Sequence, residues 1–413
     1  GFVRILFICQ YFPPEPGAPA ARTHEHARAW ARLGHQVTVV CGVPHYPEGV
    51  VPPEYRGRLL TREQVDGVAV LRCWMFAAKN RGVFLRSLSF LSFMLSSTVV
   101  AAFFAGPADV VAATSPQLLC GVSGWIAALR RRCPFVFEVR DLWPRQIVDL
   151  GVITSPLLIA PLRFLEKFLY RRAAAVVAVA PASCDALVAD GVPADRVHCI
   201  PNGIEVDFFH PLPRMNAVRE RQGWGGETFV VLYIGAHGLS QGLEIVLAAA
   251  KRLADRPDIR FVFAGGGARR EALMALAGEM GLDNVTFLTA RPKAEMPEHY
   301  AAADVCLVPL LRREVFETNI PSKMFEIMAC ARPMILGAGG QARRLLEEAG
   351  AGIAVPPEDP EALAAAILSL REHPEKGRAH GEAGRTYAEQ HCNRADRARE
   401  YAALFEAVTG GKE

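Results

Sequence analysis

The chain has 413 residues, of which 51% are apolar and 22% are charged. This length suits two domains of ordinary size, and this apolar content excludes an intrinsically disordered chain. The net charge of +3 comes from 46 basic and 43 acidic residues. So small an excess does not indicate a nucleic-acid partner, and any positive field must be local.

The cysteines and the first residues bear on the cellular location. Ten cysteines occur singly, with no CxxC pair, a pattern typical of a reduced, cytoplasmic protein without structural zinc. The first apolar run, residues 3–9, is short and leads directly into a Pro-rich loop. We therefore expect no cleavable signal peptide.

The first half of the chain alternates apolar strands with helices. The pattern predicts a first helix at residues 20–33, which Gly34 ends. Near-continuous apolar strands of this kind predict a parallel sheet with helices on both faces. The predicted strands are residues 4–9, 36–41, 68–73, 109–113, 135–139 and 174–180.

The loop at residues 13–18 joins the first strand to the first helix. Gly17 and Ala18 would let the backbone approach a phosphate or a reacting sugar. The alternative is a Pro-rich surface loop without a binding role. We expect Arg22 on the following helix to face a binding cleft and add charge. His24 and His26 suggest a metal site, but helix positions two apart point in different directions, which favours an ordinary, partly exposed role.

Residues 87–105 form an apolar run without charge, nominally long enough to cross a bilayer. Six serine and threonine residues interrupt this run, and an internal helix buried on most sides explains it as well. A helix that lies against a membrane surface, helped by Lys79, Arg81 and Arg86, is the third interpretation. The expected location is therefore cytoplasmic, either free or peripheral on the inner face of the membrane.

The alternation restarts in the second half, after a polar, Pro-containing stretch that ends near residue 228. Helices are predicted to begin near Leu243, Ala268, Glu295, Pro321 and Ala342. The predicted strands are residues 229–234, 259–264, 285–288, 304–308 and 333–336.

The sequence thus predicts an α/β fold of two Rossmann-like, doubly wound domains that face a central cleft, with ligands at the carboxyl ends of the strands. The expected domains are residues 1–205 and 206–390. The remaining residues, 391–413, include an amphipathic helix at 393–408 that is expected to pack back on the first domain.

Two further patterns limit the cofactors. Gly265, Gly266 and Gly267 follow a predicted strand, but Arg270 stands where GxGxxG needs its last glycine, so no nicotinamide cofactor is expected. No two aspartates are separated by a single residue, so the carboxylate pair that metal-dependent transferases use is missing. The charge of a leaving diphosphate would then be met by the protein alone.

The segment at residues 321–335, PSKMFEIMACARPMI, carries the strongest chemical signal. Pro321 suits the first turn of a helix, which puts Ser322 and Lys323 at a helix N-terminus. Backbone N–H groups and an ammonium group there favour an anion, and Glu326 one turn later can accept from both ribose hydroxyls. The alternative is an amphipathic helix whose Lys and Glu form a solvated pair.

Several motifs in order along nearly the whole chain resemble the retaining glycosyltransferases of the GT-B fold, family 4. They most resemble the subgroup that transfers amino or deoxyamino sugars in building bacterial surface polysaccharides. The motifs are YFPPEPGAPAAR from Tyr11, LGHQVTVV from Leu33, TSP from Thr114, VRDLWP from Val139, IPNGIEVDFFHP from Ile200, YIGAHGLSQGLE from Tyr233, FVFAGGG from Phe261 and the segment at 321–335.

The resemblance implies an acceptor-binding first domain and a nucleotide-sugar-binding second domain. It implies catalytic roles for Arg140, Asp141 and Lys323, and acceptor binding by Glu15 and Arg22. The implied donor-binding residues are Gly17, Ala18, Gly235, His237, Gly238, Gln241, Gly265, Arg291, Thr318, Asn319, Ile320, Pro321, Ser322, Lys323 and Glu326.

This sequence departs from the family's pattern at three places. Arg140 stands where many members have a histidine, and Asp141 beside it either binds a hydroxyl or caps a helix. Ala236 and Gln241 replace an arginine and a lysine, so Lys323, backbone N–H groups at 235–238 and the Gln241 side chain would hold the diphosphate. Thr318 replaces the first of two paired glutamates; either Thr318 and Asn319 bind the sugar hydroxyls or Glu317 enters the site.

The resulting hypothesis is a metal-independent, retaining transfer of a sugar from a nucleoside diphosphate donor to an acceptor hydroxyl. UDP is the expected nucleotide of the donor. The acceptor is a lipid-linked saccharide, which Arg130, Arg131 and Arg132 would suit, or a small molecule. The alternatives are an isomerase of the UDP-sugar 2-epimerase type, with Asp141 and Glu317 as acid and base, and an inactive sugar-nucleotide-binding protein.

Overall fold

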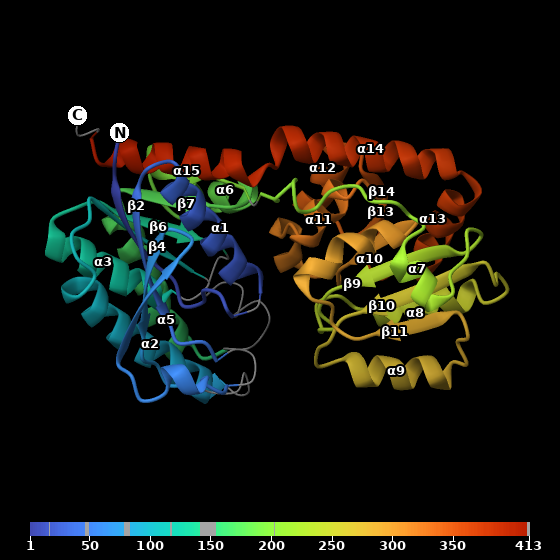
Figure 1. Ribbon diagram of the computed structural model, residues 1–413, viewed down its shortest axis with the longest axis horizontal. Helices are drawn as coiled ribbons and strands as arrows, with labels where there is room; N and C mark the ends of the chain where they lie inside the picture. The colour runs from blue at the N-terminus through green and yellow to red at the C-terminus, as the bar shows by residue number, and fades with distance from the viewer. Residues whose placement is uncertain are drawn as a thin grey trace. The chain divides into compact units, whose positions relative to one another are not determined.

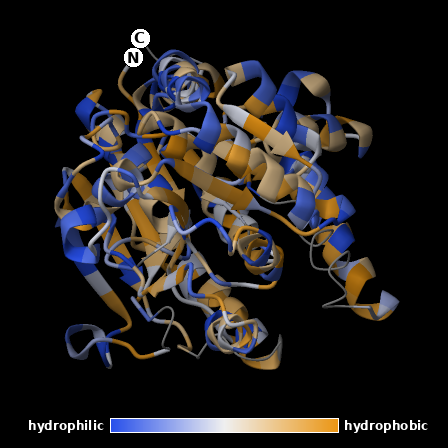
Figure 2. Ribbon diagram, turned by 90° about the vertical axis from the view of Figure 1, so that its right-hand side faces the viewer, coloured by the Kyte–Doolittle hydropathy of each residue, from blue (hydrophilic) through white to orange (hydrophobic). Residues whose placement is uncertain are grey.

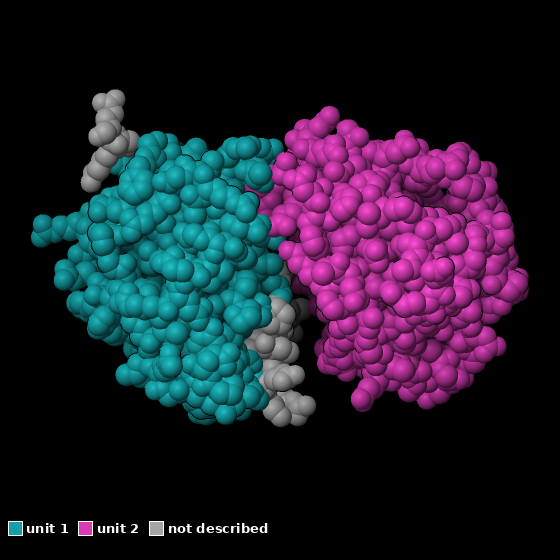
Figure 3. Space-filling view, viewed as in Figure 1, with its two compact units in different colours: residues 1–201, 395–413 teal, residues 202–394 magenta. Residues whose placement is uncertain are grey.

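The computed structural model describes residues 1–15, 17–45, 49–77, 83–115, 118–140, 154–201 and 203–410. The chain divides into two compact units (Figure 3): unit 1 comprises Gly1–Pro201 and Ala395–Glu413, and unit 2 comprises Asn202–Arg394. The sequence predicted these domain boundaries after residues 205 and 390, within a few residues of the observed ones. Each unit is an α/β layered structure with its own core.

Unit 1 is built on a sheet with the strand order β3-β4-β2-β1-β5-β6-β7-β8 among the described residues (Figure 1). All neighbouring strands are parallel except β3 and β4. The strands are β1 (Arg4–Ile8), β2 (Gln36–Gly42), β3 (Leu60–Val65), β4 (Val68–Cys73), β5 (Val110–Thr114), β6 (Phe135–Val139), β7 (Ala175–Ala178) and β8 (Val197–Cys199).

The antiparallel edge strand β3 is a correction to the expected all-parallel sheet. Asp66 and Gly67 join β3 to β4 as a two-residue turn, with φ of 50° and 80°. An Asp-Gly pair between two runs of strand-forming residues is a hairpin signal, but this hairpin was not predicted from the sequence. The short strand β8 was also missed.

Helices cover both faces of the unit 1 sheet. One face carries α1 (Ala18–Arg32) and α15 (Arg394–Val408), where the Trp30 ring packs against the rings of Tyr401 and Phe405 and Trp30 Nε1 donates to the Ala398 carbonyl. The C-terminal helix is therefore part of this layer. The other face carries α2 (Val83–Phe103), α3 (Leu119–Arg131), α5 (Pro156–Arg172) and α6 (Pro181–Ala189).

Helix α2 contains the apolar run of the sequence analysis. Only 28% of the apolar stretch within Phe84–Phe103 is buried, so an internal helix buried on most sides is the wrong interpretation. The segment has a mean hydropathy of 1.5 and is long and apolar enough to cross a membrane by length and composition alone. Its inner side nevertheless packs on the sheet through Phe93, Val100 and Ala101.

Unit 2 contains a sheet whose described strands are all parallel, in the order β11-β10-β9-β12-β13-β14. Its interior strands are apolar (Figure 2), as expected for a sheet covered on both faces. The strands are β9 (Phe229–Ile234), β10 (Ile259–Ala264), β11 (Val285–Leu288), β12 (Val305–Pro309), β13 (Met334–Gly337) and β14 (Gly352–Val355). Strand β14 was not predicted from the sequence.

The helices of unit 2 also form two layers. One face carries α8 (Glu244–Arg252), α9 (Arg270–Glu279) and α13 (Pro360–Glu372). The other carries α7 (Ala217–Gln222), α10 (Met296–Ala302), α11 (Lys323–Ala329), α12 (Gly340–Ala349) and α14 (Pro374–His391). The predicted fold class, two α/β domains with parallel sheets, is confirmed apart from the β3 hairpin.

Candidate active site

Lys323 is the first residue of α11, directly after Pro321 and Ser322, as the sequence predicted. Its Nζ lies 4.1 Å from the centroid of the Tyr233 ring at the end of β9, a cation–π distance. Burial lowers the pKa of Lys323 to about 8, although Glu326 opposes the shift. Among the described carboxylates, none forms a salt bridge with this ammonium group.

Glu326 lies one turn further along α11. Its Oε2 accepts a hydrogen bond from the Tyr300 hydroxyl of α10 at 2.5 Å. Burial raises the pKa of Glu326, while Tyr300 and Lys323 act in the opposite direction. Burial disfavours the charged forms of both this ammonium group and this carboxylate, which makes the pair a candidate functional site, because a ligand that pairs with them would remove that penalty.

Two glycines bring the loops of unit 2 close to Lys323. Gly235 and Gly265 follow β9 and β10 with φ of 151° and 147°, which side chains rarely adopt. A Cβ on Gly235 would collide with Lys323 Nζ, and a Cβ on Gly265 would overlap the Gly235 carbonyl oxygen. Glycine at these two positions is therefore required for the observed approach.

Three of the four N–H groups in the loop at 235–238 donate within the protein, so the prediction that they bind a ligand is wrong for Gly235, His237 and Gly238. The N–H groups of Gly235 and His237 donate to backbone carbonyls at 2.9 Å, and that of Gly238 donates to Gln241 Oε1 at 3.1 Å. Gln241 is thus used to close the loop. The His237 side chain is 0% exposed, which contradicts its predicted contact with the donor.

The remaining predicted donor residues lie in loops at the carboxyl ends of β11 and β12. The Arg291 guanidinium donates to the Thr289 carbonyl at 3.0 Å and also to the Thr289 hydroxyl. Thr318 and Asn319 are exposed, and the partly exposed Ile320 packs against the core of unit 2. Their contacts with a donor stay predictions.

Glu317 is directed toward α12. A Cβ on Gly339 would lie 3.2 Å from Glu317 Oε2, so the carboxylate sits beside the N-terminus of α12, where the helix dipole favours a negative charge. In this conformation Glu317 has a structural contact of its own. Its entry into the donor site in place of Thr318 stays a prediction.

Unit 1 holds a buried, paired carboxylate that was not predicted from the sequence, Glu138 of β6. Its Oε1 accepts from Thr114 Oγ1 at 3.0 Å and lies 3.4 Å from Arg22 Nε and 3.5 Å from Arg140 Nε. Burial raises the pKa of Glu138. The two guanidinium groups and His26 outweigh this effect and lower the pKa to about 2. Glu138 is therefore a carboxylate fully compensated by the protein.

This pairing changes the expectations for Arg22 and Arg140. The Arg22 side chain is 6% exposed, so the prediction that it adds charge to an open cleft is wrong. Arg140 follows β6 at a carboxyl end, where its N–H donates to Ser115 Oγ at 3.1 Å. His26 is buried too, against the expectation of a partly exposed side chain, and burial lowers its pKa to about 3.

The first loop agrees with its prediction only in part. Gly17 is the N-cap of α1, with φ of 115°, and Ala18 begins the helix. The Glu15 side chain is buried, 3.8 Å from His45 Nδ1, which contradicts an accessible acceptor contact. The predicted catalytic residue Asp141 lies outside the described residues.

Three important residues gave weak signals in the sequence. Glu138 is the one charged residue in the strand FVFEV, and a charge within a buried strand indicates a partner or a site. Tyr233 and Tyr300 contact Lys323 and Glu326 from β9 and α10. Nothing in their spacing relates them to α11, because only the fold brings the three elements together.

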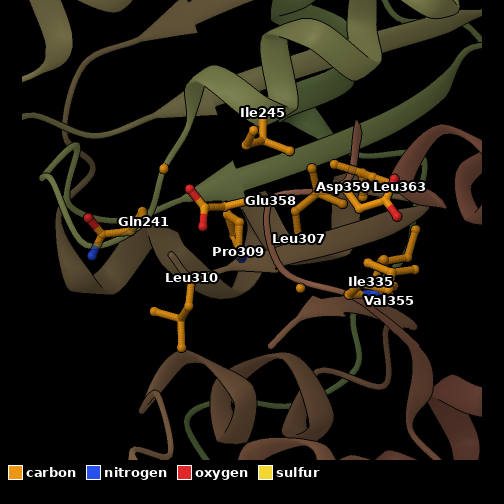
Figure 4. A pocket seen from close by; sticks show the side chains of 13 residues that line it. Gln241, Ile245, Leu307, Pro309, Leu310, Ile335, Val355, Glu358, Asp359 and Leu363 are labelled. Atoms are coloured by element: carbon orange, nitrogen blue, oxygen red, sulfur yellow. The ribbon is translucent and has the colours of Figure 1, made fainter. Parts of the chain in front are cut away.

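A pocket in unit 2 lies at the carboxyl ends of β12, β13 and β14 (Figure 4). Of the predicted donor residues, Gln241 lines it, whereas Lys323 and Glu326 do not. Its two carboxylates are engaged elsewhere: Glu358 Oε2 accepts from the Arg312 N–H, and Asp359 Oδ1 accepts from the Ala362 N–H to cap α13. The pocket therefore shares Gln241 with the groups predicted to hold the diphosphate but does not include Lys323.

Comparison with known proteins agrees with this two-unit organisation. Residues 17–203 match the family "Glycosyl transferase 4-like domain", and residues 228–373 match the family "Glycosyl transferases group 1". The chain is 26% identical to the putative colanic acid biosynthesis glycosyl transferase WcaI of Escherichia coli, over 97% of this chain and 98% of that protein.

Two further similarities complete the comparison. The chain is 30% identical to the probable glycosyltransferase WbjE of Pseudomonas aeruginosa, over 73% of this chain and 76% of that protein. The fold is similar to that of Anabaena HepE, solved in complex with UDP and glucose, with a TM-score of 0.73 and 20% identity over 98% of this chain and all of that one. The chain therefore belongs to the glycosyltransferases of GT-B fold that combine a glycosyl transferase 4-like domain with a group 1 domain.

Proposed function

We propose that this glycosyltransferase transfers a sugar from a UDP-sugar donor to an acceptor hydroxyl. The transfer needs no metal and retains the anomeric configuration of the sugar. The Lys323 and Glu326 pair carries the proposal. Its ammonium group would meet the diphosphate and its carboxylate would accept from the ribose hydroxyls. The UDP complex of HepE, a protein of the same fold, supports the choice of nucleotide.

The chemistry then needs no nucleophile from the protein. The leaving diphosphate would develop charge toward Lys323, and its own oxygen would remove the acceptor proton on the same face of the sugar. The protein supplies position and a fixed positive potential, and loss of one such donor typically raises the barrier by about 3 kcal/mol. Because three of the four backbone N–H groups at 235–238 donate within the protein, Lys323 would carry most of this stabilisation.

The donor sugar and the acceptor are the finer parts of the proposal. An N-acetylamino or deoxyamino sugar follows from the motif resemblance, as does a lipid-linked saccharide or a small molecule as acceptor. Peripheral association with the cytoplasmic face of the membrane belongs to the same proposal. The epimerase and inactive-binder alternatives gain no support from the transferase domains that the chain matches.

Thermal unfolding with nucleotides tests the proposal. A ligand that binds only the folded state raises the melting temperature, so UDP should stabilise the wild-type protein more than GDP or ADP does. Lys323→Ala should abolish this UDP-dependent shift. Lys376→Ala, an exposed lysine of α14 in the same unit, should leave it unchanged. Equal UDP shifts in the wild type and Lys323→Ala would exclude Lys323 as the diphosphate ligand.

A further inference from the structure

The outer side of α2 is apolar along its whole length. Six side chains at spacings of three or four residues point away from the sheet, which places them on one helix face: Phe84, Leu88, Leu91, Leu95, Val99 and Phe103. Phe84, Leu95 and Phe103 are 78%, 65% and 64% exposed. A helix on the surface of a globular domain normally carries polar residues on this side.

The neighbouring helices extend this apolar stripe. Helix α3 packs against both α2 and α5, through a serine hydrogen bond on one side and the rings of Trp125 and Phe168, 4.9 Å apart, on the other. Leu129 of α3 and Leu157 and Phe164 of α5 are exposed, Leu157 by 85%. The three helices share one face of the unit 1 sheet (Figure 1), so their exposed apolar residues gather on one layer.

Positive charge surrounds this layer. Arg86 lies 6.0 Å from the Phe90 ring centroid, and Arg130 lies 5.5 Å from that of Phe103, so both cations sit beside the apolar residues. Helix α5 adds Arg163, Lys167, Arg171 and Arg172. The single acidic residue on these three helices is Glu166, although the whole chain has a net charge of only +3.

The inner side of α2 is packed in the core of unit 1, which favours a helix that lies on a membrane over one that crosses it. Ser97 Oγ and Ser123 Oγ are 2.8 Å apart in a buried contact between α2 and α3, and Phe93 and Ala101 are fully buried against the sheet. Spanning a bilayer would remove these residues from the core of unit 1 and leave the sheet uncovered. An in-plane helix keeps the core and buries only the outer stripe.

We propose that the outer face of α2, α3 and α5 is a docking surface for an anionic lipid bilayer. The stripe on α2 enters the boundary between head groups and acyl chains, and the arginines and lysines of α3 and α5 pair with lipid phosphates. A second copy of the chain is disfavoured as the occupant, because it would bring the same cations face to face. This surface specifies the peripheral association of the proposed function and is independent of the transfer chemistry.

Vesicle flotation with the whole protein tests the surface. Wild-type protein should float with vesicles of phosphatidylcholine and phosphatidylglycerol, and binding should fall about tenfold or more on phosphatidylcholine alone or in high salt. Leu91→Glu with Leu95→Glu should weaken binding about tenfold or more. Met274→Glu, an exposed apolar residue on α9 of unit 2, is the matched control and should float as the wild type does.

Other results would overturn the proposal. It fails if the wild type does not float with anionic vesicles, if the Leu91 and Leu95 double variant binds them normally, or if size exclusion shows a dimer that this variant dissociates. Arg163→Glu with Lys167→Glu should remove the preference for anionic lipid. The UDP-dependent thermal shift, measured on each variant, reports folding and the donor site separately, so a missing UDP shift with intact flotation would refute only the proposed donor.

Discussion

The two units each bury a charged cluster near the carboxyl ends of their strands, but the clusters differ in how their charge is balanced. In unit 1, Glu138 is flanked by Arg22 and Arg140, and these partners lower its pKa to about 2 despite burial. In unit 2, burial prevails: it lowers the pKa of Lys323 to about 8 and raises that of Glu326.

We interpret this difference as that between a structural cluster in unit 1 and the proposed donor site in unit 2. The protein itself satisfies the charge of Glu138, so a ligand would add little there. Burial disfavours the charged forms of Lys323 and Glu326, and a bound diphosphate with its ribose would relieve both penalties. The unit 2 cluster should therefore govern activity with little effect on stability, whereas the unit 1 cluster should govern stability.

Glu138→Gln is expected to have the largest effect on stability. It leaves two buried guanidinium groups without their carboxylate, a change that typically costs about 3 to 5 kcal/mol. The folded-state pKa of Glu138 lies below its ordinary 4.5, so its contribution is present above that pH and is lost as the pH falls through about 2. Urea unfolding at neutral pH measures the loss.

The surface pair of Arg343 and Glu347 gives the matched control for Glu138→Gln. Its atoms lie 2.8 Å apart, but both side chains are more than half exposed. Glu347→Gln should change the free energy of unfolding by only about 0.3 kcal/mol, as is usual for an exposed helical pair. Equal effects of the two substitutions would contradict the compensated role of Glu138.

Lys323→Met should have the opposite profile. We expect turnover to fall about a hundredfold or more, because the leaving diphosphate loses its cation. The free energy of unfolding should be unchanged or higher, because a half-buried ammonium group with a lowered pKa is replaced by an apolar chain of similar length. Steady-state transfer assays and urea unfolding measure both. Normal turnover, or a loss of stability like that of Glu138→Gln, would reverse the comparison.

The pH dependence of UDP binding sharpens the assignment of Lys323. With its pKa at about 8, UDP affinity should fall as the pH rises through 8, by up to about tenfold per unit. The sign for stability is opposite: the folded protein binds this proton less tightly than the unfolded chain does, so stability without ligand should rise between pH 8 and 10.5. Calorimetric titration and urea unfolding across this range measure the two trends.

Lys323→Arg supplies the control for the pH series. A guanidinium group stays charged throughout this range, so the alkaline loss of UDP affinity should disappear even if the affinity itself is lower. An unchanged alkaline decline in Lys323→Arg would show that another group titrates.

The sequence predicted what local patterns determine. Apolar alternation located most strands, and the PSKMFEI segment placed Lys323 and Glu326 on one helical turn. It did not predict the partners of charged residues, because Glu138 meets Arg22 and Glu326 meets Tyr300 only through tertiary packing. The glycine loop at 235–238 shows the same limit: its composition suggested phosphate binding, but three of its four N–H groups donate within the protein.

Tyr300→Phe is the smallest expected effect and compares the two units through matched residues. Tyr300 donates to Glu326 and lowers its pKa, so without the hydroxyl the pKa of Glu326 should rise further. As the pH is lowered, the loss of UDP affinity should therefore begin at a higher pH in the variant than in the wild type. The loss of the hydrogen bond should also reduce the free energy of unfolding by about 1 kcal/mol. Calorimetric titration below pH 7 measures the shift. Tyr401→Phe, beside Glu138 in unit 1, should leave the UDP profile unchanged, since that carboxylate serves the fold; an acid shift in both variants would mean that the two clusters do not act separately.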